Sequence, residues 1–80
     1  MNAREIQELL DREPFQPFRV KLSSGDQYDI RDPNLAIAMR SQLFLAWPRS
    51  DRWTFVPYLH VAAVENLPNG GSPRDSRRRG

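Results

Sequence analysis

Residues 15–30 of this 80-residue chain, FQPFRVKLSSGDQYDI, predict one β-hairpin. Phe18, Val20 and Leu22 alternate with charged or polar residues, so one face of the first strand is apolar and the other is wet. Gly25 interrupts the run, and glycine readily takes the positive φ that a short loop with a bulge requires. The alternation then resumes in the second half of the stretch. We therefore expect the rest of the chain to pack around this hairpin.

The segment before the hairpin predicts a short amphipathic helix over residues 2–12. Asn2 is a suitable N-cap, and Glu5 follows three residues later, which is a variant of the capping box. Pro14 ends the helix, because proline disfavours helix in the residue before it. A helix of this length is marginal in isolation, so it should dock on the sheet. Its apolar stripe consists of Ile6, Leu9 and Leu10.

Alternating apolar residues after the hairpin favour a strand over residues 35–39, although few of these residues are β-branched and a helical turn also fits residues 35–40. Residues 43–47, LFLAW, form a near-continuous apolar run, which is typical of a strand covered on both faces. Further strands are predicted at residues 53–56 and 61–64. A polar loop, residues 48–52, and a tight corner, residues 57–59, connect these strands.

This order of elements predicts a mainly β fold. We expect the N-terminal helix to be followed by a five-stranded, strongly bent antiparallel sheet or small barrel of the Sm-like or SH3-like kind, since closure removes exposed edges. An open sheet with the helix on one face is the alternative. The domain should span residues 1–67, and residues 68–80 should form a disordered, arginine-rich tail, because they combine Pro, Gly, Ser and Arg without apolar partners.

The positive charge of the chain is concentrated near its C-terminal end. Residues 74–80 hold four arginines and one aspartate, a net charge of +3, whereas residues 1–73 hold 8 basic and 9 acidic residues, a net charge of −1. These values agree with the overall +2. Attraction to phosphate must therefore come from the tail or from a local patch.

Several classes of protein are disfavoured by composition. The chain has no cysteine and one histidine, which excludes disulfides and thiolate metal sites and leaves few metal ligands. No run approaches the ~18 apolar residues of a membrane span, and no signal peptide is recognisable at the N-terminus. We expect a soluble, cytoplasmic protein without a metal or cofactor. An enzyme would need a deep pocket with convergent polar groups, for which the chain has few residues.

Three segments resemble the Sm-like family, in particular its Hfq group of bacterial RNA chaperones. LLDREPFQPFRVKLSSG, residues 9–25, is similar to the end of the family's helix and its first strand, and residues 27–30 match its second strand. VPYLHVAAV, residues 56–64, resembles its closing corner and last strand. The pattern PFxPFRVxLxxGxxYxI is also similar to that of small bacterial proteins. The likeness covers roughly residues 3–66.

The resemblance implies a function. Sm-like proteins form rings of six or seven subunits by pairing the fourth strand of one subunit with the fifth strand of the next. They bind uridine-rich RNA through a Tyr-Lys-His corner and a glutamine on the helix. By position these residues are Tyr58, His60 and Gln7. Leu59 stands where the family has the lysine, and Asp29 where it usually has a glycine that lets the second strand bend.

The aromatic and acidic residues outside this motif have simpler interpretations. Phe44 and Phe55 are predicted to be core residues, because a small domain has few other large apolar groups. Trp47 and Trp53 flank the polar loop, and either indole becomes a candidate contact site if it is exposed. The acidic residues of the hairpin and its exit are predicted to be solvated and not to bind a cation, and they are Asp26, Asp29 and Asp32.

Two non-enzymatic functions stay open. The first is an RNA-binding module, a homo-oligomeric Sm-like protein that associates through its strand edges and acts in RNA binding or regulation. Its predicted contact residues are Gln7, Tyr58, His60, Arg77, Arg78 and Arg79. The second is an SH3-like protein-interaction module without a nucleic-acid role, in which an open edge or an apolar groove near Trp47 and Trp53 takes a peptide or a partner strand. The near-neutral body favours the second, whereas the resemblance and the arginine-rich tail make the first our prediction.

Overall fold

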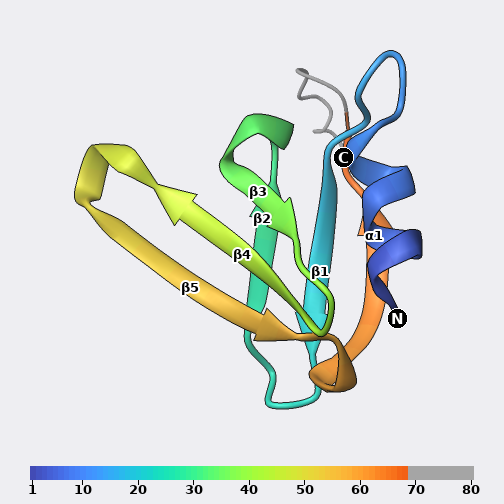
Figure 1. The fold of residues 1–80 in the computed structure, drawn as a ribbon, viewed down its shortest axis with the longest axis vertical. Coiled ribbons are helices and arrows are strands. Elements are labelled where there is room, and N and C mark those ends of the chain that lie inside the picture. The colour runs from blue at the N-terminus through green and yellow to red at the C-terminus, as the bar shows by residue number, and fades with distance from the viewer. Residues whose placement is uncertain (69–80) are drawn as a thin grey trace, which may run out of the picture.

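The predicted hairpin lies in the first of two sheets (Figure 1). In the computed structural model, which describes residues 1–68, β1 (Phe18–Leu22) pairs antiparallel with β2 (Gln27–Ile30). Gly25 has a φ of +98°, and its N–H donates to the carbonyl of Leu22 at 3.0 Å. β6 (Val61–Asn66) pairs with the other side of β1, which gives the order β2–β1–β6.

The second sheet is built from the next three strands. β3 (Ala36–Ala38), β4 (Gln42–Trp47) and β5 (Arg52–Pro57) pair antiparallel in that order. Figure 1 shows β4 and β5 as a long hairpin that extends away from β1. Three single-turn 3-10 helices connect the strands, and they are η1 (Pro33–Leu35), η2 (Pro48–Ser50) and η3 (Tyr58–His60).

The predicted capping box begins the helix α1 (Ala3–Leu10). The Asn2 side chain accepts a hydrogen bond from the Glu5 N–H at 2.9 Å, and the Glu5 carboxylate accepts one from the Asn2 N–H at 2.9 Å. The helix contacts β3 and β4, and Ile6 and Leu10 are buried there. The helix is shorter than predicted, because it ends before the Asp11 cap.

The mainly β class is confirmed, but the five-stranded barrel is wrong. The described residues form six strands in two three-stranded sheets, and the sheets do not close into a barrel. The cause lies where the chain leaves β2. The Asp32 carboxylate accepts a hydrogen bond from the Asn34 N–H at 2.9 Å, and Pro33 begins η1. β2 therefore stops at Ile30 and does not continue into the second sheet.

Residues 35–40 were predicted to form either a strand or a helical turn, and the structure contains a part of each. Leu35 closes the 3-10 turn η1, and Ala36–Ala38 form the strand β3. At the C-terminal end of the fold, Leu67 is buried and its N–H donates to the carbonyl of Pro17 at 2.9 Å. The tail was predicted for residues 68–80, and all of it except residue 68 lies outside the described residues.

One apolar core lies between the two sheets and the helix. Its largest fully buried side chains come from α1, β1, β4 and β5, and they are Ile6, Phe18, Val20, Leu43 and Val56. β1 contributes the alternate residues Phe18 and Val20 to this core, and β4 contributes Leu43 and Leu45, as expected for sheets with one buried face. The core is thin, because a chain of this size buries only about 60% of the surface of its unfolded form.

The two sheets differ on their outer faces. On the first sheet, Arg19 pairs with Asp29 at 2.7 Å and Lys21 pairs with Glu65 at 3.0 Å. On the second sheet, Phe44 lies opposite Phe55, and both side chains point away from the core. The prediction that Phe44 and Phe55 are core residues is therefore wrong. Their neighbours along the strands take the inward positions.

Candidate binding surfaces

The residues predicted for RNA binding lie in different environments. Tyr58 is buried, with 5% of its surface exposed, and its hydroxyl donates to the carbonyl of Met39 at 2.6 Å. Burial raises the pKa of the Tyr58 hydroxyl. In this conformation the ring belongs to the core and the hydroxyl stabilises the loop that follows β3.

His60 and Leu59 are exposed at the corner between β5 and β6. Leu59 is 95% exposed, so this turn presents an apolar side chain to solvent. The His60 side chain is also exposed, and its backbone carbonyl accepts a hydrogen bond from the Ser23 N–H at 2.9 Å. Of the three corner residues, two are accessible to a partner.

Gln7 lies on the exposed face of α1. Its side-chain amide donates to Asp11 at 2.9 Å. It also lines an open hollow of about 580 Å³ together with Asp11 and Glu13, and the lining of this hollow contains no basic side chain. A hollow with two carboxylates disfavours phosphate. His60 does not line it, and Arg77, Arg78 and Arg79 lie outside the described residues.

A groove runs between the edge of β2 and the second sheet. Its apolar part is a hollow of about 240 Å³ beneath Trp47. One wall is formed by the end of β2, and the other by β4 and the start of β3. The apolar residues that line it are Ile30, Leu35, Ala36, Leu45, Ala46 and Trp47. We call this hollow and its continuation, described next, the inter-sheet groove.

The groove continues on the other side of Trp47 as a more open hollow of about 460 Å³, which shares Asp29 and Trp47 with the first. The Trp47 ring lies 5.9 Å from that of Tyr28, and the Arg52 guanidinium lies over Trp47 at 5.2 Å from the ring centroid. A cation in this position is held by the negative face of the indole. Trp47 is thus fixed between an aromatic ring and a guanidinium.

Asp29 is the electrostatic centre of the groove rim. Arg19 donates to its two carboxylate oxygens at 2.7 and 3.3 Å, and Arg31 lies 3.6 Å away. The hydrogen bond from Arg19 is the main cause that lowers the pKa of Asp29, against a smaller opposing effect of burial. The same contact raises the pKa of Arg19. Asp29 therefore does not present an unpaired negative charge to the groove.

The edge of β2 offers backbone hydrogen bonds to the groove. The Leu22 N–H donates to the carbonyl of Asp26 at 2.8 Å. This bond determines which residue pairs along the hairpin are hydrogen-bonded and which are not. Tyr28 and Ile30 consequently exchange hydrogen bonds with β1, whereas the N–H and C=O of Asp29 point away from it. Within residues 1–68, β1 is the only strand paired with β2.

The structure separates the two tryptophans. Trp47 lies opposite Arg52, and Trp53 lies opposite Ala46, so the two indoles are on opposite faces of the second sheet. Trp47 lines the inter-sheet groove, and Trp53 is 63% exposed on the outer face. The predicted groove near both residues therefore contains only Trp47.

Sequence reasoning did not find Tyr28, Arg19 and Arg52 as groove residues. The signal was the Asp32–Pro33 turn, which ends β2 early and leaves its edge unpaired beside Trp47. The acidic residues of this region are solvent-exposed, as predicted. Asp26, Asp29 and Asp32 are exposed, and they bond to Ser24, Arg19 and Asn34.

Within residues 1–68 there is no group of three or more His, Cys, Asp or Glu side chains that could hold a metal ion. No helix of the described part is long and apolar enough to cross a membrane. A scan of known protein families found no match to this chain, and searches of curated proteins and of solved structures found no similar protein.

Proposed function

We propose that this protein is a non-enzymatic protein-interaction module that takes an extended segment of a partner protein into the inter-sheet groove. The observation that carries the proposal is the open edge of β2 beside an apolar hollow of about 240 Å³. An extended segment can add to such an edge as a further strand, and its main-chain hydrogen bonds give affinity for many sequences.

Selectivity comes from the side chains of the bound segment. Successive side chains of a strand point to opposite sides, so alternate residues of the segment face the groove. One apolar side chain fits the hollow beneath Trp47. The Asp29 carboxylate at the rim is already paired with Arg19 and Arg31, so the partner's contribution is mainly apolar and main-chain in character.

The experiment is a selection of phage-displayed random peptides on the purified protein, followed by titration of the recovered peptides. We expect peptides with alternating apolar residues. Trp47→Ala and Asp29→Pro should each weaken binding by about tenfold or more, because a lost contact worth about 1.4 kcal/mol changes affinity tenfold. Proline at position 29 removes the N–H that points away from β1 and keeps the hairpin bonds.

Asp29→Ala is the matched control, because it loses the same carboxylate and keeps the N–H. It should bind the selected peptides within about threefold of the wild type. Equal losses in Asp29→Pro and Asp29→Ala would contradict main-chain pairing at this edge. A selection that recovers no peptide dependent on Trp47 would refute the groove as the site.

A second candidate function is an RNA-binding, Sm-like homo-oligomer. It is supported by the exposed His60 at the corner and by β5 and β6, each of which has an unpaired outer edge among the described strands. The described residues hold 8 basic and 9 acidic side chains, a net charge of −1, so the body supplies little attraction to phosphate.

Short uridine-rich and adenine-rich RNAs, titrated at several salt concentrations, test this candidate. An RNA-binding protein should bind with saturation at low salt, and both His60→Ala and loss of Arg77, Arg78 and Arg79 should reduce the affinity. Absence of saturable binding at low salt would end the RNA hypothesis and leave the protein-interaction proposal intact.

A further inference from the structure

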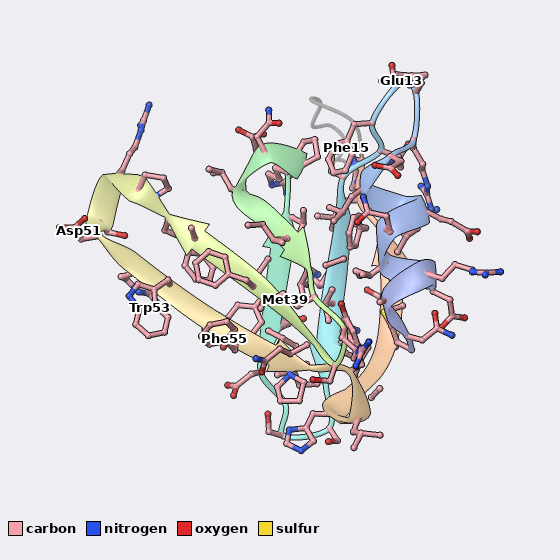
Figure 2. All side chains as sticks on the ribbon, viewed as in Figure 1. Glu13, Phe15, Met39, Asp51, Trp53 and Phe55 are labelled. Atoms are coloured by element: carbon pink, nitrogen blue, oxygen red, sulfur yellow. The ribbon has the colours of Figure 1, made fainter. Side chains whose placement is uncertain are left out.

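The outer face of the second sheet is apolar across all three strands. The pairing register places Ile37 opposite Phe44 and Phe44 opposite Phe55, so these side chains share one face. Trp53 lies on the same face, two residues before Phe55. Figure 2 shows Trp53 and Phe55 projecting from β5 into open space. We call Ile37, Phe44, Trp53 and Phe55 the outer aromatic face.

The aromatic rings of this face contact one another. Ring centroids lie 5.3 Å apart for Phe44 and Phe55, 5.7 Å for Trp53 and Phe55, and 6.5 Å for Phe44 and Trp53. Their mutual contacts hold the rings in place, so a partner would meet an ordered surface. Nevertheless Trp53 is 63%, Ile37 58% and Phe55 41% exposed. The surface is organised but uncovered.

Neither the tail nor a polyanion is a suitable cover. Residues 69–80 contain no Val, Leu, Ile, Met or aromatic residue. None of the four side chains of the face is charged, so a nucleic acid would find stacking rings without cations for its phosphates. An apolar surface of complementary shape is required. The apolar run of residues 43–47 likewise has the composition of a strand that is covered on both faces.

The area of the face suits a small dimer. Aromatic side chains bury 150–250 Å² each, so the exposed parts of this face amount to roughly 400 Å². The largest apolar patch on a typical monomer covers about 300–600 Å² and is often functional. Two copies together would remove roughly 800 Å² of the face itself, and the surrounding rim brings the interface to about 1,000 Å², the lower limit of specific interfaces.

We propose that a second copy of this chain covers the outer aromatic face, sheet against sheet, around a two-fold axis that runs along β4. Such an axis lies between the large Phe55 on β5 and the smaller Ile37 on β3. It sets Phe55 of each copy against Ile37 of its partner, which makes the face complementary to itself. Aligned packing of this kind is usual for two sheets.

This mode of association differs from pairing of strand edges, and it leaves the inter-sheet groove free on the opposite face of the sheet. Because the interface is small, we expect a dissociation constant in the micromolar range. The dimer should therefore form and dissociate over concentrations that solution methods reach.

Sedimentation velocity over roughly 5–500 µM tests the proposal, because that range brackets a micromolar dissociation constant. The wild type should pass from monomer to dimer. Trp53→Glu and Phe55→Glu should each weaken dimerisation at least tenfold, since burying an unpaired carboxylate is costly. Leu59→Glu is the matched control: Leu59 is more exposed than either residue, lies on η3 and should leave dimerisation unchanged.

A wild type that stays monomeric at the highest concentration would overturn the proposal. So would an oligomer that Trp53→Glu and Phe55→Glu leave intact, because its interface would lie elsewhere. Circular dichroism checks that both variants fold. A second measurement needs no variant: dilution of the wild type should shift tryptophan emission to longer wavelength with the same midpoint as the fall in mass. Unchanged emission while the mass falls would contradict burial of Trp53.

Discussion

The two sheets have three strands each, yet their outer faces are opposite in character. The first sheet carries the Arg19–Asp29 and Lys21–Glu65 ion pairs outside and apolar residues inside. The second sheet has buried apolar residues inside and also carries the half-buried Phe44 and the exposed Trp53 and Phe55 outside. Contact with solvent is sufficient to explain the charged outer face of the first sheet. The second pattern indicates a contact that the single chain does not make.

The difference also separates residues that stabilise the fold from residues available for binding. In the first sheet the boundary follows the strand alternation. In the second sheet apolar residues lie on both faces, so burial is needed to distinguish the two sets. Paired substitutions, one of a buried residue and one of an exposed residue on the same strand or in the same loop, test this difference between the two sheets most directly.

The largest effect is expected for neighbouring residues on opposite faces of β5. Val56 is 1% exposed and Phe55 is 41% exposed. Val56→Ser should lower the free energy of unfolding by about 2–4 kcal/mol, because it leaves a cavity and buries a hydroxyl. Phe55→Ser should cost about 1 kcal/mol or less in the monomer. Urea denaturation at low protein concentration measures both, and equal losses would contradict the assignment of faces.

The hairpin of the first sheet should respond to Gly25→Ala. A Cβ at this position would meet no atom within 4 Å, so the cost comes from the backbone φ of +98°. We expect a loss of about 1–2 kcal/mol in the free energy of unfolding. Ser23→Ala in the same loop is the control and should change the value by less than about 0.5 kcal/mol. Thermal unfolding followed by circular dichroism distinguishes the two.

Tyr58→Phe probes the contact between η3 and the loop after β3. The variant removes the hydroxyl that donates to the Met39 carbonyl and should cost about 1 kcal/mol in stability. Its association and peptide binding should equal those of the wild type. A Tyr58→Phe variant with native stability but altered ligand binding would show that Tyr58 acts in recognition and not in folding.

The smallest effect on stability is expected for the solvent-exposed face of the first sheet. Arg19 holds the pKa of Asp29 below its ordinary value of 3.8. Ionised Asp29 therefore stabilises the fold above this value, and the contribution is lost as the pH falls through the lower pKa of the folded state. Asp29→Asn should be less stable than the wild type at neutral pH, and the gap should narrow below pH 3.8. Urea midpoints across pH measure this, and a gap independent of pH would exclude the ion pair as its source.

Local features of the fold were predictable because their signals are local. Asn2 and Glu5 define the helix start, and Gly25 defines the hairpin loop, through interactions between residues close in sequence. The 3-10 turn of residues 58–60 likewise lies within one residue of the corner predicted at residues 57–59. Such signals do not depend on how the sheets pack.

The faces and the barrel were not predictable in the same way. Leu43, Phe44 and Leu45 are all apolar, so alternation cannot select which of them points inward. Barrel closure depends on the length of β2, which the turn at Pro33 cuts short. The inter-sheet groove has the same cause, because it lies where the early end of β2 leaves the two sheets unjoined.

The molar mass of the wild-type chain as a function of concentration tests the central claim most directly, that the outer aromatic face is a contact surface between copies. Light scattering should give the 9.3 kDa of one chain at low micromolar concentration and twice that mass at high concentration. A mass of one chain throughout would contradict the account, as would a larger assembly that persists on dilution.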